Sequence, residues 1–188
     1  HGRALPIDRE RATGASLIRK GSVTVLRAAA GHVDITPPVG TELAGWCFGA
    51  STGIADRLCA RALVLDDGRA PLALITMDLI GLGTPEADRV RSEVAARLGT
   101  SRDRVLVSCS HTHSGPGAMP LRRWGGVDPA YLARTLDSVV AMVEACGSRL
   151  EPAGVAVGEG VVHGICSNRR GDRGNVVDER LPVLTVRG

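Results

Sequence analysis

Aromatic residues are scarce in this chain, at 2% of 188 residues, with two Trp, one Tyr and one Phe. A core must therefore be built from Val, Leu, Ile and Ala, and the sequence offers no aromatic belt for contact with lipid. Lysine is almost absent, since Lys20 stands alone among scattered arginines. With a net charge of +3 and no block of like charges, binding to nucleic acid is not expected.

The cysteines also lack a pattern that would indicate pairing. The five cysteines are odd in number and show no CxxC spacing, which argues against a disulfide framework or a cysteine zinc site. No apolar run approaches the length of a membrane span, so no transmembrane segment is expected. The chain begins at His1 without an initiator Met, so we expect a processed or truncated start, and the residues themselves do not indicate a compartment.

The chain has the length and hydrophobic content of one domain with a sizeable core. Residues 1–20 are polar and rich in Arg without clear periodicity, and we expect a flexible or poorly defined segment there. Residues 21–188 carry the periodic patterns of a folded part. Apolar runs predict strands over 22–28, 58–65, 72–80, 104–107, 153–162 and 181–186.

Two helices are predicted between these strands. Thr84-Pro85 opens the first, with Thr84 as the N-cap, and Asp128-Pro129 opens the second. Gly99 and Gly147 end them. Residues 39–52 are expected to form a long glycine-containing loop. The order of elements predicts an α/β fold, a layered architecture with a mixed β-sheet core flanked by helices.

Two histidines stand where the 104–107 strand gives way to a Gly/Pro turn, in Ser110-His111-Thr112-His113-Ser114-Gly115-Pro116-Gly117. On an extended chain, residues i and i+2 share a face, so His111 and His113 would look into one space while Thr112 looks away. Two imidazoles on one face suit a metal site or acid/base chemistry. The alternative is a pair of solvated or core histidines without a chemical role.

Asp78 lies near the end of the 72–80 apolar run. A carboxylate there is either hydrogen-bonded for structural reasons or faces a site at the strand ends. A three-ligand metal set made of His111, His113 and Asp78 is therefore a further hypothesis.

The histidine stretch resembles the signature of the neutral/alkaline (non-lysosomal) ceramidases, which are zinc amidohydrolases that cleave the N-acyl bond of ceramide. Other segments resemble the family in the same order: residues 33–40, 44–46, 52–54, 60–65, 76–81 and 167–170. The resemblance implies a partial domain, the N-terminal part of a catalytic domain with an α/β core flanked by helices. It also implies a secreted or periplasmic location.

The resemblance further implies roles for individual residues. His111 matches a zinc ligand, and His113 matches a histidine that hydrogen-bonds in the active site and assists the reaction. Arg169 matches an arginine near the polar head of the substrate, in a catalytic and substrate-binding role. Gly45 matches a glycine whose backbone lies at the substrate. The implied cofactor is Zn²⁺, and the implied partner is ceramide or a related N-acyl lipid, with peripheral contact to membrane lipid.

The chain also departs from the family pattern. The remaining zinc ligands of the family, a histidine, a glutamate and a tyrosine, lie beyond the segment that matches here. We therefore expect this chain to supply only part of an active site that is completed by further sequence or by a partner. The alternative is a non-catalytic ceramidase-like binding domain with an incomplete metal site. A smaller departure is Ala55, where relatives commonly have a histidine before Asp56.

Overall fold

The computed structural model describes residues 25–45, 49–120, 125–168, 170 and 176–188. Two compact units are present, one extending to Ala153 and the other holding Gly154–Arg187, and each is described by itself. The segment 1–20 that we expected to be flexible lies outside the described residues. The division into 1–20 and 21–188 stays a prediction.

The first unit is built on a five-stranded sheet in the order β5-β4-β3-β1-β7. Its strands are β1 (Arg27–Asp34), β3 (Cys59–Asp66), β4 (Leu72–Met77), β5 (Val105–Cys109) and β7 (Glu151–Pro152). β4 and β5 run parallel, whereas the pairs β4–β3, β3–β1 and β1–β7 are antiparallel. The sheet is therefore mixed, as the sequence predicts.

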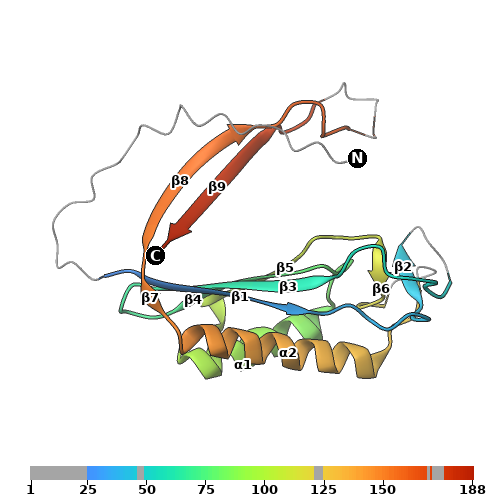
Figure 1. Ribbon diagram of the computed structural model, residues 1–188, viewed down its shortest axis with the longest axis horizontal. Coiled ribbons are helices and arrows are strands. Elements are labelled where there is room, and N and C mark those ends of the chain that lie inside the picture. The colour runs from blue at the N-terminus through green and yellow to red at the C-terminus, as the bar shows by residue number, and fades with distance from the viewer. Residues whose placement is uncertain (1–24, 46–48, 121–124, 169, 171–175) are drawn as a thin grey trace. The chain divides into compact units, whose positions relative to one another are not determined.

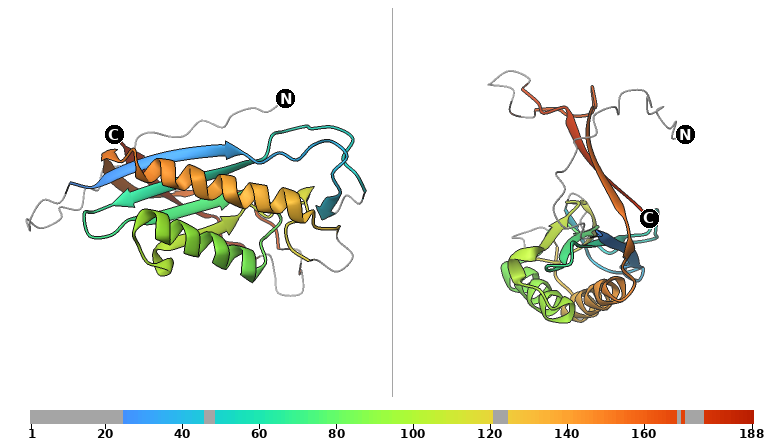
Figure 2. Two further views of the ribbon diagram at one scale, coloured as in Figure 1. Left: turned by 90° about the horizontal axis from the view of Figure 1, so that it is seen from below. Right: turned by 90° about the vertical axis from the view of Figure 1, so that its left-hand side faces the viewer.

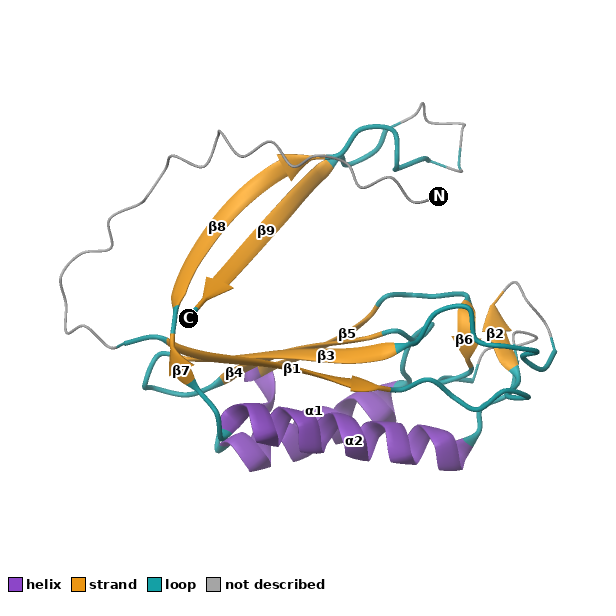
Figure 3. Cartoon of the chain, in the orientation of Figure 1, coloured by secondary structure: helices purple, strands orange, loops and turns teal. Residues whose placement is uncertain are grey.

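Helices α1 (Thr84–Leu98) and α2 (Pro129–Gly147) cover one face of this sheet (Figures 1 and 3). Figure 2 shows the two helices side by side along that face. The ion pairs Arg89–Asp137 and Arg97–Glu144 join them at the surface. The core lies between the helices and the sheet, and it is aliphatic, including Val64, Ile75, Met77, Val90, Val94, Leu136, Val139 and Val143. The predicted layered α/β fold is confirmed.

The hairpin between β3 and β4 turns at residues 66–69, whose sequence Asp-Asp-Gly-Arg is a strong hairpin signal. Asp66 accepts a hydrogen bond from the Gly68 N–H at 2.8 Å, and Asp67 accepts one from the Arg69 N–H at 3.0 Å. Gly68 has φ of +80°, a conformation that glycine adopts without steric cost. Local hydrogen bonds of Asp side chains thus fix the turn that joins the two buried strands.

The helix starts agree with the sequence in one case and differ in the other. Asp128 is the N-cap of α2, because its carboxylate accepts from the backbone N–H groups of Ala130 and Tyr131. The predicted N-cap of α1 was wrong. Gly83 caps that helix and its carbonyl accepts the first helical bond from Ala87, so Thr84 is already helical. The C-cap Gly99 is left-handed, as expected of a glycine at a helix end.

Two strand predictions are corrected. The first strand runs over Arg27–Asp34 and so extends past the predicted end at residue 28, because it pairs with β3 along this whole length. Residues 22–24 of the predicted range lie outside the described residues. The expected loop 39–52 contains β2 (Leu43–Gly45), which pairs antiparallel with β6 (Ser114–Pro116). Neither three-residue strand has a periodic pattern of its own, so only the long-range pairing defines them. A 3₁₀ turn, η1 (Arg102–Arg104), leads into β5.

The second unit contains β8 (Gly154–Val161) and β9 (Arg180–Arg187), paired antiparallel from Gly154↔Arg187 to Val161↔Arg180. Both strands agree closely with the predicted ranges 153–162 and 181–186. Across the part of the chain that the structure describes, neither helix has the length and hydropathy of a membrane span.

The buried sheet position Ile75 gives a direct test of the layered core. Ile75 is 1% exposed at the centre of β4, whereas Leu106 on the neighbouring strand β5 is 55% exposed. We expect Ile75→Ala to lower the free energy of unfolding by about 2–5 kcal/mol, because it leaves a cavity. Leu106→Ala, the matched control, should cost less than about 1 kcal/mol in the same urea titration. Equal losses for the two variants would contradict the described layering.

Candidate functional site

The segment 110–117, which we call the histidine loop, is positioned by the parallel pairing of β4 and β5. The paired register ends at Met77↔Cys109, and the backbone N–H of Ser110 donates to the Met77 carbonyl at 3.0 Å. The segments that follow the two strands, one beginning at Asp78 and the other at Ser110, therefore start side by side at one edge of the sheet. This is the edge at which parallel strands place functional groups in α/β proteins.

The ring of His111 is fixed by a backbone carbonyl. Its Nδ1 lies 2.6 Å from the carbonyl oxygen of Ile80. A carbonyl only accepts hydrogen bonds, so Nδ1 carries a proton, and in the neutral imidazole the lone pair then lies on Nε2. A hydrogen bond of this kind orients metal-binding histidines and sets their tautomer. His111 is thus prepared to use Nε2 as a ligand or a base.

His113 lies against His111, with ring centroids 4.8 Å apart and ring planes at 73°. The prediction that the two imidazoles share one space is confirmed, although the backbone route differs from the expected extended chain. His111 has φ of +59°, in the left-handed region that non-glycine residues rarely occupy. The rings therefore meet through a tight turn after β5, and not through the alternation of a strand.

Gly45 holds the backbone of β2 close to His113. It is buried, has φ of +120°, and pairs with Ser114 across β2 and β6. A Cβ atom at Gly45 would lie 2.7 Å from the Cβ and 2.8 Å from the backbone oxygen of His113. The residue therefore has a packing role that its small size explains. The substrate contact implied by the family resemblance stays a prediction.

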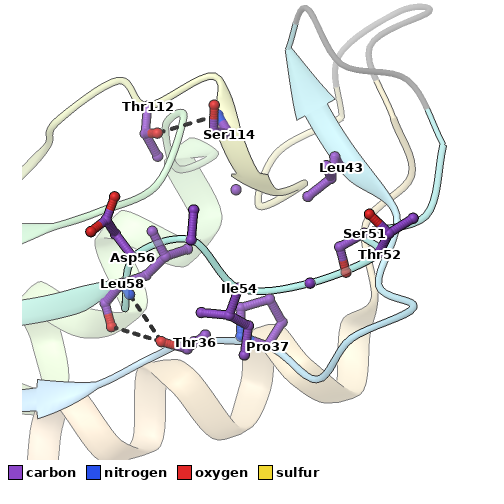
Figure 4. A pocket seen from close by; sticks show the side chains of 13 residues that line it. Thr36, Pro37, Leu43, Ser51, Thr52, Ile54, Asp56, Leu58, Thr112 and Ser114 are labelled. Atoms are coloured by element: carbon purple, nitrogen blue, oxygen red, sulfur yellow. Dashed lines mark hydrogen bonds between the residues drawn. The ribbon is translucent and has the colours of Figure 1, made fainter.

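A pocket of about 340 Å³ adjoins the histidine loop (Figure 4). Thr112, Ser114 and Gly115 form its wall on the side of the loop, and His111 and His113 are not among the described residues that line it. The remaining wall comes from the ends of β1 and β2 and from the segment before β3: Thr36, Pro37, Leu43, Ser51, Thr52, Gly53, Ile54, Ala55, Asp56 and Leu58. Thr112 thus faces away from the imidazoles, as predicted, and into a pocket that the sequence did not reveal.

Hydrogen bonds hold the floor of this pocket. The Ile35 N–H donates to the Leu58 carbonyl at 2.9 Å, and the Leu58 N–H donates to the Thr36 hydroxyl at 2.9 Å. The hydroxyl and backbone N–H of Thr36, together with Arg57, lower the pKa of Asp34 to about 2. Asp34 therefore stays charged at neutral pH and keeps its ion pair with Arg57 beside the pocket.

Sequence reasoning assigned no role to the pocket residues Asp56 and Thr112. Among the described residues that line the pocket, Asp56 is the one ionisable side chain. Figure 4 shows Asp56 and Thr112 at the same end of the pocket, away from Leu43 and Thr52. A local signal existed, because Asp56 follows Ala55, the position at which the chain departs from the family pattern.

The hypothesis of a three-ligand metal set made of His111, His113 and Asp78 is wrong. Within the described ranges, no three His, Cys, Asp or Glu side chains are grouped closely enough to hold a metal ion. The Asp78 carboxylate accepts instead from the Cys59 N–H at 3.0 Å and from Arg61 at 3.1 Å. Among the described residues, His111 can supply one imidazole ligand to a metal ion, because its ring orientation is already fixed.

One predicted site residue cannot be placed. Arg169, for which the family resemblance implies a substrate-binding role, lies outside the described residues. His163, which matches no family ligand, contacts Glu179 at 2.7 Å in the second unit. Tyr131, another residue without a matching role, donates its hydroxyl to the Ile35 carbonyl and is buried.

The fold and the loop define a class of protein: a layered α/β domain with a paired-histidine loop at the carboxyl end of a parallel strand. Residues 27–172 match the family model described as "Neutral/alkaline non-lysosomal ceramidase, N-terminal". The chain belongs to this family, and the resemblance drawn from the motifs is confirmed.

Relatives and solved structures agree with this assignment. A curated relative, "Neutral ceramidase" of Mycobacterium tuberculosis (strain ATCC 25618 / H37Rv), is 31% identical over 134 residues, covering 63% of this chain and 20% of the relative. The solved structure "Ceramidase complexed with C2" superposes with a TM-score of 0.72 at 21% identity. The neutral ceramidase of Pseudomonas aeruginosa gives 0.69 at 23% identity. Both structures match over 87% of this chain and 29% of theirs.

The chain thus spans about a fifth of the length of the curated relative and 29% of the solved chains. At these identities the superpositions show a shared fold.

The close approach of Gly45 to His113 yields a prediction. We expect Gly45→Ala to lower the free energy of unfolding by at least about 1 kcal/mol more than Gly40→Ala does, because only the first variant places a methyl group inside the contact distance of another residue. Gly40 is the matched control, since it also has positive φ, at +94°, but no atom lies within 4 Å of an added Cβ.

The NMR signals of the two imidazoles provide a second measurement on these two glycine variants. Those of His111 and His113 should shift in Gly45→Ala and stay in place in Gly40→Ala. Equal stability losses with unmoved histidine signals would contradict the packing role of Gly45.

Proposed function

We propose that this protein is a zinc-dependent amidohydrolase of neutral ceramidase type, which hydrolyses the N-acyl bond of ceramide or a related N-acyl lipid. The observation that carries the proposal is the hydrogen bond from His111 Nδ1 to the Ile80 carbonyl, which leaves Nε2 as a ligand atom. Membership of the ceramidase family supports the same reaction. The described residues would supply part of the active site.

In this proposal His111 holds zinc through Nε2. A zinc ion lowers the pKa of a bound water to about 7 and polarises an amide carbonyl. Catalytic zinc takes at least three protein ligands, so one imidazole is not enough. The remaining ligands, which the family pattern gives as a histidine, a glutamate and a tyrosine, would come from outside the described residues, either from further sequence or from a partner. This division of the site follows the expectation drawn from the family pattern.

His113 is proposed as the residue that assists the reaction. Its ring lies beside His111, and an imidazole can accept or donate a proton near neutral pH. It would exchange a proton with the reacting amide while His111 is committed to the metal. Arg169 is proposed near the polar head of the substrate, where a guanidinium can orient a hydroxyl group or offset negative charge.

The pocket beside the loop is proposed to receive the hydroxyl-bearing part of the substrate on the amine side of the amide. Its wall carries Asp56 and five residues with hydroxyl groups, Thr36, Ser51, Thr52, Thr112 and Ser114. A carboxylate is an acceptor, so it favours ligand groups that donate hydrogen bonds. The sphingoid portion of ceramide carries such hydroxyls, whereas a bare alkyl chain carries none.

Replacement of His111 tests the zinc and the reaction together in the native protein. Loss of even a hydrogen-bond partner of a metal ligand lowers activity about 10–100-fold. We therefore expect His111→Ala to reduce fatty-acid release from ceramide by more than about 100-fold and to lower the zinc content measured by mass spectrometry. His163→Ala is the matched control, because it removes an exposed imidazole from the second unit.

The outcomes separate the proposal from its alternative. Zinc content and turnover that survive His111→Ala would contradict the assignment of His111. A native protein that binds ceramide in vesicles but carries no zinc and releases no fatty acid would instead be a non-catalytic ceramidase-like binding domain.

Replacement of Asp56 tests the proposed pocket. We expect Asp56→Asn to raise KM about 3–10-fold for an N-acyl amino alcohol, since a partly exposed charged hydrogen bond is lost. The KM of the matching N-acyl alkylamine, which lacks hydroxyls, should change less than about twofold. Asp67→Asn, in the β3–β4 turn, serves as the control. The same increase in KM for both substrates would exclude selection by Asp56.

A further inference from the structure

Tyr131 ties the first turn of α2 to the chain that leaves β1. Its hydroxyl donates to the Ile35 carbonyl at 2.5 Å, and the two residues are only 6% and 4% exposed. The backbone N–H of Tyr131 donates to the carboxylate of the N-cap Asp128, so the helix start that carries the phenol is itself fixed. Removal of the hydroxyl would take this donor away from a carbonyl inside the protein, which is costly.

Ile35 is held from a second side as well. Its backbone N–H donates to the Leu58 carbonyl at 2.9 Å, so α2 engages one polar backbone group of Ile35 and the segment before β3 engages the other. The next residue, Thr36, repeats the link, because its hydroxyl accepts from the Leu58 N–H at 2.9 Å (Figure 4). These three hydrogen bonds join the helix, the chain leaving β1 and the segment before β3 into one cross-linked unit.

The cross-linked unit forms part of the pocket wall. Thr36 lines the pocket from the chain leaving β1, and Asp56 and Leu58 line it from the segment before β3. Neither Ile35 nor Tyr131 is among the described residues that line the pocket, so the phenol lies behind the wall and acts on it through Ile35. The position of Thr36 relative to Asp56 therefore depends on these hydrogen bonds.

We infer that Tyr131 is a positioning residue of the pocket: its hydroxyl fixes the spacing between Thr36 and Asp56, and so sets the affinity for the hydroxyl-bearing part of an N-acyl amino alcohol. The inference rests on the proposed function, which places those hydroxyls in this pocket. Hydrogen bonds to a ligand form only over a narrow range of distance, so the hydroxyls need partners at a fixed spacing. An alkyl chain makes no such demand.

Thr100 offers a matched control at the opposite end of the sheet. It follows the C-cap of α1, and its hydroxyl donates to the Pro71 carbonyl at 2.8 Å. Pro71 precedes the start of β4, which lies across β3 from the start of β1, whereas the pocket adjoins the end of β1. Tyr131→Phe and Thr100→Val each remove one hydroxyl that binds a backbone carbonyl. Both should lower the midpoint of urea unfolding, but only the first should affect the pocket.

The experiment compares hydrolysis of an N-acyl amino alcohol and of the matching N-acyl alkylamine by the native protein and its variants. We expect Tyr131→Phe to raise KM about 3–10-fold for the amino alcohol, because the pocket wall loses one hydrogen bond that holds it. The kcat should change less than about twofold, since the histidine loop is untouched. The KM of the alkylamine, and both KM values in Thr100→Val, should stay within about twofold of the parent.

A double variant shows whether Tyr131 acts through the pocket wall. Tyr131→Phe combined with Asp56→Asn should raise KM for the amino alcohol by less than the product of the two separate increases, because both changes weaken binding of the same hydroxyls. A full product would overturn the inference. So would an unchanged KM in Tyr131→Phe, equal increases for both substrates, or an equal effect of Thr100→Val.

Binding of the free amino alcohol, measured by titration calorimetry, separates this inference from the proposed function. A parent protein that binds the amino alcohol but releases no fatty acid would overturn the proposed function. In that case, weaker binding in Tyr131→Phe and unchanged binding in Thr100→Val would still support the inference. A parent protein that releases fatty acid but binds no amino alcohol would overturn the inference and leave the hydrolase assignment standing.

Discussion

The parallel pairing of β4 with β5 is the constraint on which the rest of the site depends. It brings Met77 opposite Cys109, so that the chain leaving β4 and the chain leaving β5 emerge side by side. The carbonyl of Ile80 can then accept from His111 although 31 residues separate them. α1 makes this pairing feasible, since a parallel connection needs a crossover, and the helix also covers the sheet.

Around this pairing the histidine loop is held by backbone groups more than by side chains. The Met77 and Ile80 carbonyls hold it from one side, and the three-residue pairing of β2 with β6, which ends at Gly45, holds it from another. Backbone contacts of this kind fix the course of the loop. They also explain why glycine stands at Gly45, where any side chain would collide with His113.

Much of the fold could be predicted because its signals are local. The Asp-Asp-Gly turn, the N-cap at Asp128 and the apolar stripe of α2 each depend on residues a few positions apart. β2 could not be predicted, because three residues carry no period and the strand exists only through its pairing with Ser114–Pro116. The bounds of β1 failed for the same reason, since Ala and Gly residues give a weak pattern and the partner strand β3 decides where pairing begins.

The sequence by itself determined the family, the helices, and the pairing of two histidines in one loop, since all three are encoded in contiguous residues. Only the tertiary structure decided what those histidines are bonded to. The proton on His111 Nδ1 follows from the Ile80 carbonyl, and the separation of Asp78 from the histidine pair follows from its bonds to Cys59 and Arg61. The pocket at Asp56 likewise arises from segments that meet across the fold. A hydrogen bond depends on distance in space, and separation along the chain does not fix that distance.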